Sequence, residues 1–354
     1  MNASGAALPP PLAEDRRLVL ERTRPLWESL RGRRLLLVGG TGFVGCWLLE
    51  TLLAAQDALD LGAEVVILSR HPAGFAARAP HLAGHPAVHV VAGHPAAAEL
   101  PPGPFALAIH APACAPGAGA VPPAGAMVRD LLVATRRVLA HCGVTGVERL
   151  LLVSTGAVYR PVPAAEAVGE THPLVGVSAG PEPTYPQVRR EVEDLCRDAA
   201  AAQGFALAIA RGFSFLGPHL PLDRRFAVGD FLQDAAAARP VRVAGSGRAV
   251  RSYLYAADLA EWLWTILLRG RAGAAYNVGG SRPVTIADLA RVAGQAAQPP
   301  QPVVVAGEAA PGAAPDHYLP DTTLARREFG LAETVTLSAA VARTLAWLRA
   351  RTAT

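Results

Sequence analysis

A tyrosine and an arginine stand one helical turn apart in the segment TYPQVRREVEDLC, residues 184–196. Its apolar residues recur at helical intervals, which predicts an amphipathic helix with Tyr185 at its start and Arg189 on the same face. A phenol ordinarily titrates at a pH of about 10, and a fixed neighbouring cation favours the phenolate. Such a pair could act as the general acid/base of a reaction that moves a proton.

Arginine supplies the cation, because the chain contains no lysine and all 33 of its Lys and Arg residues are arginines. A guanidinium offers a planar fork of hydrogen-bond donors but cannot release a proton, so a proton relay through position 189 is excluded. Pro186 directly follows Tyr185 and disfavours helical backbone at the tyrosine. This proline would tilt the phenol away from Arg189.

A glycine-rich turn indicates a second kind of chemistry. The stretch VGGTGFVG, residues 38–45, places Gly39, Gly42 and Gly45 in the spacing G-x-x-G-x-x-G between a buried strand pattern and an apolar helix pattern. Glycine at these places allows a tight turn, close approach of the backbone to a pyrophosphate and close packing of the next helix. The phosphates then lie at the positive end of that helix. We therefore predict a dinucleotide site.

The end of the second expected strand selects the dinucleotide. An NAD site usually ends this strand with an acidic residue that binds the ribose 2′-hydroxyl. Here Ser69 occupies that place and Arg70 follows, so a 2′-phosphate meets a neutral hydroxyl and a guanidinium. NADP is therefore the preferred cofactor, with NAD as the alternative. The cofactor contacts predicted from the turn and the strand end are Gly39, Thr41, Gly42, Phe43, Val44, Gly45, Ser69 and Arg70.

These residues need a scaffold, and the chain supplies one by alternating short apolar strand patterns with longer helical patterns from Arg34 onward. This alternation predicts an α/β fold with a doubly wound parallel sheet of the Rossmann type. We predict an N-terminal extension at 1–30, partly disordered, and a dinucleotide-binding domain at 31–212. A smaller substrate lobe is expected mainly at 213–354, interleaved with the last strands and helices of the sheet.

Composition excludes several other classes of function. The net charge of +4 comes from scattered arginines without a long basic run, so no nucleic-acid partner is expected. No apolar run reaches the roughly 18 residues of a membrane span, and the first residues lack the apolar core of a signal peptide. We therefore expect a cytoplasmic protein that does not cross a membrane.

Cysteine and histidine spacing gives no metal site. Cys46, Cys114, Cys142 and Cys196 show no paired spacing and are expected to be reduced, mostly buried thiols. Residues 81, 85 and 89 are histidines at intervals of four, but Pro86 interrupts any helix that would align them. We expect a polar loop here and no bound metal.

Several motifs together resemble the extended short-chain dehydrogenase/reductase family, and more narrowly its NAD-dependent epimerase/dehydratase branch, which acts on nucleotide sugars. The motifs are GGTGFVG, STGAVY at 154–159, Tyr185 with a basic residue four positions on, FLGP and RSYLYAADLA. The resemblance covers nearly the whole chain from about Leu26. It implies hydride transfer between a sugar carbon and a nicotinamide, with Tyr185 as general acid/base and Thr155 bonded to the sugar oxygen.

The resemblance also implies how the substrate is held. Lysine occupies the place of Arg189 in the family, where it provides the cation and holds the nicotinamide ribose. The resemblance thus adds Ala111, Tyr185 and Arg189 to the expected cofactor contacts. Arg251 matches an arginine that binds the nucleotide diphosphate, whereas Ser214 replaces the usual asparagine and Ala310 replaces a later arginine. The helices near 128–142 and 186–202 match the pair that forms a homodimer interface, so a homodimer is expected.

Departures from the family pattern narrow the reaction but leave alternatives. The 4,6-dehydratases follow the catalytic threonine with Asp-Glu, whereas this chain has Gly156 and Ala157, which disfavours water elimination. Epimerisation or simple redox chemistry on a nucleotide-activated sugar remains. The weakened diphosphate grip allows a ketoreductase acting on another metabolite. Arg189 and Pro186 allow a dinucleotide-binding protein without catalysis.

Overall fold

Seven parallel strands form the central sheet of this computed structural model, which describes residues 10–112, 124–161, 166–176, 184–222, 226–309 and 314–352. The spatial order is β3-β2-β1-β4-β5-β6-β11, and every neighbouring pair is parallel. The strand bounds are β1 (Arg34–Val38), β2 (Glu64–Ser69), β3 (Val88–Ala92), β4 (Leu107–His110), β5 (Arg149–Thr155), β6 (Ala206–Gly212) and β11 (Ala275–Val278). The predicted doubly wound fold is confirmed.

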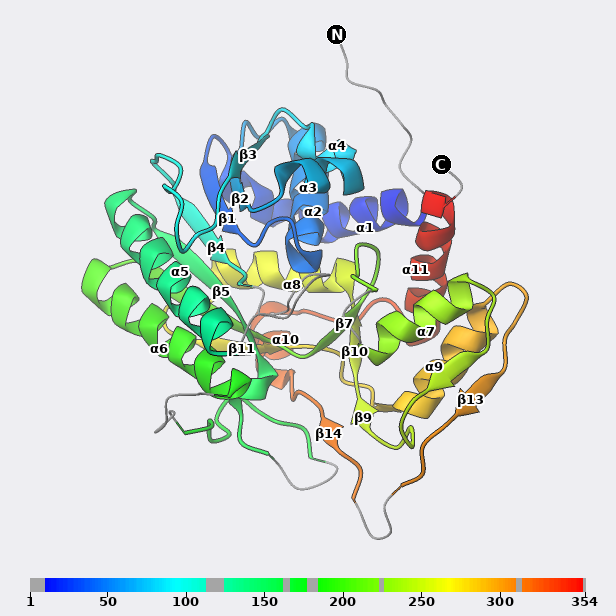
Figure 1. Cartoon of the computed structure of the whole chain (residues 1–354). Helices are drawn as coiled ribbons and strands as arrows, with labels where there is room; N and C mark the ends of the chain where they lie inside the picture. Colours follow the sequence, from blue (N-terminus) through cyan, green and yellow to red (C-terminus); the bar gives the residue numbers. More distant parts are fainter. Residues whose placement is uncertain are drawn as a thin grey trace.

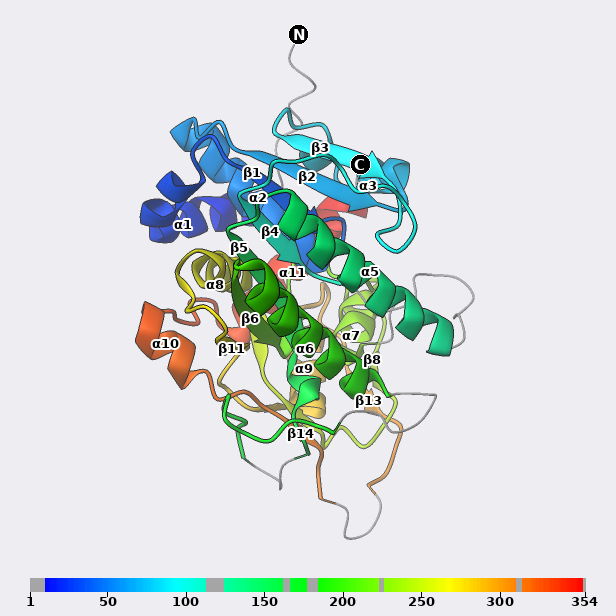
Figure 2. The same ribbon diagram turned by 90° about the vertical axis from the view of Figure 1, so that its left-hand side faces the viewer.

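Helices cover both faces of the sheet (Figures 1 and 2). One face packs against α2 (Phe43–Leu59) and α8 (Ala256–Arg269), and the other against α5 (Ala124–Val144) and α6 (Tyr185–Gln203). Neighbouring residues of β1 point to opposite faces, so Leu36 joins the core under α5 and α6 while Leu37 joins the core under α2 and α8. Burial on both faces explains why these strands are continuous apolar runs.

The strand order reverses between β1 and β4, which are neighbours in the sheet although β2 and β3 separate them in sequence. Ligands of such sheets bind in the crevice outside the carboxyl ends of the strands at this reversal. Gly39 follows β1 and Ala111 follows β4. The fold therefore places the glycine turn at the edge where a dinucleotide is expected.

The N-terminal segment is more ordered than we predicted. Residues 10–27 of the expected extension form α1 (Pro10–Trp27), followed by the short η1 (Glu28–Leu30). The rings of Trp27 and Trp264 meet edge to face at 5.2 Å, and Asp15 bonds to both Tyr255 and Arg343. Sequence reasoning missed this helix because its stabilising partners lie in α8 and near the C-terminus.

The C-terminal part of the chain contributes to two hydrophobic cores. Its segments α8 and β11 complete the large sheet layer, while α7 (Ala227–Ala236), α9 (Ile286–Ala296) and α11 (Leu337–Thr352) surround a second core. Figure 1 shows α7, α9 and β13 together beside the sheet. The remaining elements are α3 (Pro72–Arg78), α4 (Pro80–Ala83), η2 (Gly156–Val158), β7 (Ser214–Leu216), β8 (Val241–Val243), β9 (Val250–Arg251), β10 (Tyr253–Tyr255), β12 (Val284–Thr285), β13 (Val303–Val305), β14 (His317–Tyr318) and α10 (Thr323–Phe329).

The described cysteines are buried, and the described helices are too short or too polar to span a membrane. Cys46, Cys142 and Cys196 are buried free thiols, and burial raises the pKa of each to about 12. Cys114 lies outside the described residues. Among the helices in the described ranges, none is both long and apolar enough to cross a lipid bilayer.

Candidate dinucleotide and reaction site

The glycine turn leaves no room for a side chain at two of its three predicted positions. Gly39 has a φ of +91°, and a Cβ there would lie 2.1 Å from the carbonyl oxygen of Ala111. A Cβ at Gly45 would lie 2.4 Å from the Cα of Gly40. At Gly42 the nearest atom would be 3.4 Å away, so packing within the chain does not require glycine at that position.

The other residues predicted to hold the cofactor surround this turn. Ala111 donates its backbone N–H to the carbonyl of Val38 at 2.9 Å, which fixes the end of β4 against the end of β1. Phe43 and Val44 open α2, whose first N–H groups have no partner within the helix. Arg78 of α3 donates to the carbonyl of Thr41 at 3.0 Å. Sequence reasoning missed Arg78, which adds a positive charge over the turn.

The end of β2 carries the two residues that were expected to select the cofactor. Ser69 is buried, and its hydroxyl accepts a hydrogen bond from the backbone N–H of His71 at 3.2 Å. Arg70 is exposed. The guanidinium is therefore accessible at the strand end, while the serine hydroxyl is engaged with the local turn.

The predicted tyrosine lies at the start of α6. Thr184 caps this helix reciprocally with Gln187, and Pro186 stands in the first turn, where a missing N–H costs little. The side chain of Tyr185 is 47% exposed. The proline thus fits the helix start, and it leaves the phenol at the surface of the crevice.

Arg189 is engaged by the backbone of the sheet. Its side chain is buried, with 2% exposed, and its terminal nitrogens donate to the carbonyls of Pro112 at 3.0 Å and Val153 at 2.6 Å. Within the described part of the chain, its Nε has no hydrogen-bond partner. The guanidinium therefore links the carboxyl ends of β4 and β5, and any support for Tyr185 acts through charge across one helical turn.

A histidine beside Arg189 was missed by the sequence analysis. His110 ends β4 and is fully buried, with its Nε2 3.0 Å from the hydroxyl of Thr135 and its Nδ1 unpartnered. Burial, assisted by the positive charge of Arg189, lowers the pKa of His110 to about 3. The imidazole is therefore neutral beneath the crevice.

Thr155 ends β5, where it meets a tyrosine from the far end of the chain. Its Oγ1 lies 3.2 Å from the hydroxyl of Tyr318 and accepts the backbone N–H of Ala157 at 3.2 Å. Burial raises the pKa of Tyr318 to about 12, and the nearby Tyr185 adds to the increase. A phenol and a hydroxyl are therefore in contact at the carboxyl end of β5, and the charge of Tyr185 acts on them from nearby.

Tyr318 also connects Thr155 to the predicted diphosphate-binding arginine. The guanidinium carbon of Arg251 lies 5.9 Å from the centre of the Tyr318 ring, and one of its nitrogens bonds to the carboxylate of Asp316. Ser214 lies in β7 opposite Tyr253, and the described residues show no hydrogen bond from its side chain to this group. Ala310 lies outside the described residues.

A buried polar network stands behind β5. The hydroxyl of Tyr159 donates to Asn277 at 2.7 Å and accepts from Arg211 at 3.0 Å. Arg211 pairs through two nitrogens with Glu193, which also accepts from Ser154 at 2.7 Å. Burial opposes ionisation of Glu193, but Arg211 lowers its pKa overall. This network holds α6 against β5 and β6 and so positions the helix that carries Tyr185.

Comparisons with known proteins bear on the family and the fold of the chain. Residues 35–279 match the model of the family described as "NAD dependent epimerase/dehydratase family". Among curated proteins, UDP-glucuronic acid decarboxylase 1 of Arabidopsis thaliana is 26% identical over 291 residues, which are 78% of this chain and 61% of that protein. A trifunctional UDP-glucose 4,6-dehydratase, epimerase and reductase of the same plant is 30% identical over 164 residues, or 46% of this chain and 24% of that protein. The chain thus spans less than two thirds of the length of either relative.

Solved structures share the fold at low identity. UDP-glucuronic acid 4-epimerase from Bacillus cereus, in complex with UDP-glucuronic acid and NAD, has a TM-score of 0.72 at 18% identity, covering 90% of this chain and 99% of that one. A dTDP-glucose 4,6-dehydratase from Streptomyces venezuelae, with NAD and TYD bound, has a TM-score of 0.71 at 22% identity, covering 90% and 98%.

Proposed function

Because this chain belongs to the NAD dependent epimerase/dehydratase family, we propose that it is an NAD(P)-dependent oxidoreductase or epimerase of a nucleotide-activated sugar. The observation that carries this proposal is the contact of Thr155 with Tyr318 at the carboxyl end of β5, with the charge of Tyr185 near enough to raise the pKa of Tyr318. The same edge carries the glycine turn. Hydroxyl groups that can hold and move a proton therefore lie on the side of the sheet where the cofactor is expected.

Each side chain has a role in this reaction. Tyr185 takes the proton of a sugar hydroxyl during oxidation and returns it during reduction. Thr155 holds the same oxygen by exchanging its contact with Tyr318 for a contact with substrate. Arg189 remains fixed on two carbonyls and supplies positive charge. A bound nicotinamide would supply the hydride chemistry.

The turn fits the pyrophosphate of such a cofactor. Gly42 has room for a side chain and yet carries none, which leaves space for a ligand beside the backbone. The first N–H groups of α2, which have no partner within the helix, lie next to this space and can bind phosphate oxygens. NADP is our proposed cofactor. The exposed Arg70 can pair with a 2′-phosphate, and no carboxylate stands at Ser69 to repel one. Arg78 adds charge nearby.

Elimination of water is not part of the proposed reaction. A Cβ at Gly156 would lie 2.4 Å from the ring of Phe213, so an acidic side chain at this place would require the ring to move. Ala157 offers no carboxyl group either. Epimerisation or plain redox chemistry therefore fits the residues that follow Thr155 better than 4,6-dehydration.

The proposal is tested by substitution of the two tyrosines. The chain is assayed with UDP-, dTDP-, GDP- and CDP-sugars and with both cofactors, for epimer formation and for nicotinamide reduction. Tyr185→Phe is expected to lower turnover by about 10²- to 10⁴-fold while cofactor binding is kept. Tyr318→Phe is the matched control, with a smaller loss. If Tyr318→Phe abolishes turnover and Tyr185→Phe does not, the role of Tyr185 is wrong.

Two observations favour second candidates. The ion pair of Arg251 with Asp316 occupies the guanidinium expected to bind a diphosphate, which favours a ketoreductase acting on another metabolite. Absence of thermal stabilisation by every nucleotide tested would support that reading. Anchoring of Arg189 on backbone carbonyls favours a dinucleotide-binding protein, which tight NADPH binding without hydride exchange would support.

We also propose a homodimer formed through α5 and α6. These helices lie side by side on one face of the sheet (Figure 2), and Val133 on α5 is 41% exposed. Light scattering after size exclusion tests this assembly, and a monomer at micromolar concentration would refute it.

A further inference from the structure

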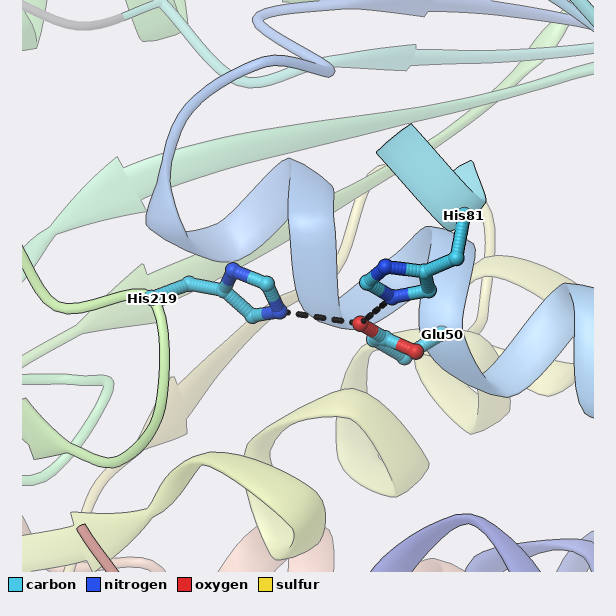
Figure 3. Close-up of side chains that lie close together, drawn as sticks. All are labelled: Glu50, His81 and His219. Carbon is cyan, nitrogen blue, oxygen red and sulfur yellow. Dashed lines mark hydrogen bonds and ion pairs between the residues drawn. The ribbon is translucent and has the colours of Figure 1, made fainter. Parts of the chain in front are cut away.

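Three potential metal ligands from distant parts of the chain converge beside α2. Figure 3 shows Glu50 on α2, His81 on α4 and His219 in the loop after β7. The Nε2 atom of His81 lies 2.7 Å, and that of His219 2.9 Å, from the same oxygen, Oε1 of Glu50. The three ligand atoms all lie within 4.8 Å of one another. They form a two-histidine, one-carboxylate donor set.

The carboxylate is buried and only partly satisfied. Glu50 is 0% exposed, and its second oxygen, Oε2, has no hydrogen-bond partner among the residues that the structure describes. The nearest cation is Arg16, 3.5 Å from Oε2, which also lies 3.7 Å from Asp57. A buried carboxylate oxygen in this state is one that a bound cation would satisfy.

The loop that carries His219 is held in an uncommon conformation. The backbone φ of His219 is +68°, in the left-handed region that residues other than glycine adopt rarely. Trp47 donates to the carbonyl of Pro218 at 2.8 Å, and the ring of Trp347 meets the imidazole of His219 edge to face at 5.1 Å. The surrounding structure thus fixes the imidazole toward Glu50, which is how strained residues at functional sites persist.

We propose that Glu50, His81 and His219 bind a divalent transition-metal ion of the Zn²⁺ type. Two imidazoles and a carboxylate with an open position are a donor set that Zn²⁺ accepts. Tetrahedral coordination at about 2.0–2.1 Å separates the ligands by about 3.3 Å, so the present contacts need to open only slightly. Zn²⁺ is bound by the Nε2 lone pair of each neutral imidazole, with the ring proton on Nδ1, so no proton lies between Nε2 and Oε1 once the ion is bound.

The ion would link parts of the fold rather than act on substrate. The ligands join α2, which begins at the glycine turn, to α4 and to the loop between β7 and α7. His81 is 30% exposed, which gives the ion an entry from solvent, whereas His219 is 6% exposed. Arg16 keeps Asp57 as a partner once the metal neutralises Glu50. Thr155 and Tyr185 take no part in this cluster.

The test measures metal binding directly on the full chain without a polyhistidine tag. The chain is stripped with chelator, dialysed against Zn²⁺ and analysed for metal, and in parallel it is titrated with Co²⁺. We expect about one Zn²⁺ per chain, a higher melting temperature and the intense visible absorption of four- or five-coordinate Co²⁺. The proposal would be overturned if the dialysed chain held no more Zn²⁺ than the dialysis buffer, or if the titration with Co²⁺ gave no such absorption.

Variants identify the ligands. His81→Ala removes a half-exposed ring, and His219→Asn keeps a residue that tolerates the left-handed backbone. Each is expected to weaken Co²⁺ binding by at least about tenfold. His89→Ala is the matched control, because its ring is exposed and lies 3.7 Å from Glu64, away from the cluster. Equal Co²⁺ binding by the wild type and His81→Ala, with circular dichroism confirming the fold, would show that the ion binds elsewhere.

Discussion

The glycine turn and the group formed by Thr155, Tyr185, Arg189 and Tyr318, here called the reaction corner, lie on the same edge of the sheet. They meet their functional requirements differently. At the turn the requirement is the absence of a side chain, since a Cβ at Gly39 or Gly45 would collide with backbone. At the corner the requirement is a relation between side chains, and there Arg189 bonds to two carbonyls while Tyr185 remains half exposed. A requirement on the backbone can be predicted from residue types alone. A contact between two side chains also depends on the other groups, such as backbone carbonyls, that can hydrogen-bond to either of them.

The competition at Arg189 has a chemical reason. A guanidinium carries donors on two separate terminal nitrogens, so it can satisfy two carbonyl groups at the ends of β4 and β5 at once. An ammonium is a compact charge on a flexible stem and is free to turn toward a ligand. In this chain without lysine, residue 189 therefore provides hydrogen bonds to the backbone as well as a positive charge.

The largest expected effect breaks the turn itself. Gly39→Ala adds a clash with Ala111 to the cost of a left-handed backbone, and we expect a loss of about 2–5 kcal/mol in the free energy of unfolding together with loss of NADPH binding. Gly62→Ala is the control, because its φ is also positive, at +61°, and nothing lies within 4 Å of its Cβ. Urea unfolding and cofactor titration measure both. Similar losses in the two variants would show that strain, not the clash, dominates.

A second variant at the turn separates packing from ligand approach. Gly42→Ala has room for its methyl group, so its unfolding free energy should stay within about 1 kcal/mol of the wild type. NADPH binding should nevertheless fall sharply if the pyrophosphate lies against this residue. Unchanged NADPH affinity, measured by fluorescence titration, would place the phosphates elsewhere.

Arg189→Lys sharpens the other side of the comparison. The substitution disrupts two part-buried hydrogen bonds to carbonyls, and we expect the unfolding free energy to fall by about 1–3 kcal/mol. Arg33→Lys, which changes an exposed ion pair with Glu148, should stay within about 1 kcal/mol. Thermal and urea unfolding give both values. If Arg189→Lys is as stable as the wild type, the two carbonyl bonds contribute little.

His110 gives the corner a pH dependence that the turn lacks. The unfolded chain protonates this residue below its ordinary pKa of 6.5, whereas the folded chain resists protonation until about 3. The unfolded state therefore binds more protons between these values, and stability falls by up to about 1.4 kcal/mol for each pH unit lost. His110→Gln should flatten the urea midpoint between pH 6.5 and 4.5, relative to a His89→Gln control. A parallel dependence in both variants would assign the effect to other groups.

The smallest effect concerns cofactor choice. Arg70→Ala should weaken NADPH binding by about tenfold and leave NADH binding nearly unchanged, because only the former carries a 2′-phosphate. Titration at low and high salt checks whether the difference is electrostatic. If both cofactors weaken equally, Arg70 contacts a part that they share, and Arg78→Ala becomes the next variant to test.

Sequence reasoning succeeded where periodicity or a local turn carried the information. The alternation of patterns predicted the parallel sheet, whose seven strands are all parallel to their neighbours. It failed where partners lie far apart. The polar loop predicted at His81 is instead the short helix α4, whose histidine bonds to Glu50, and His219 reaches the same carboxylate from 169 residues away. Tyr318 was missed likewise, because β14 reaches the crevice only by pairing with β9.

The docking of α1 has a consequence for the order of events during synthesis. Arg22 bonds to Asp258, 236 residues later, and Asp15 bonds to Arg343, 328 residues later. These partners leave the ribosome long after α1 does, so the growing chain offers the helix only nearer partners, such as Glu50 and Asp57 for Arg16, and its docking stays incomplete. A nascent chain arrested before residue 258 should therefore leave α1 open to proteolysis, and a released full-length chain should protect it.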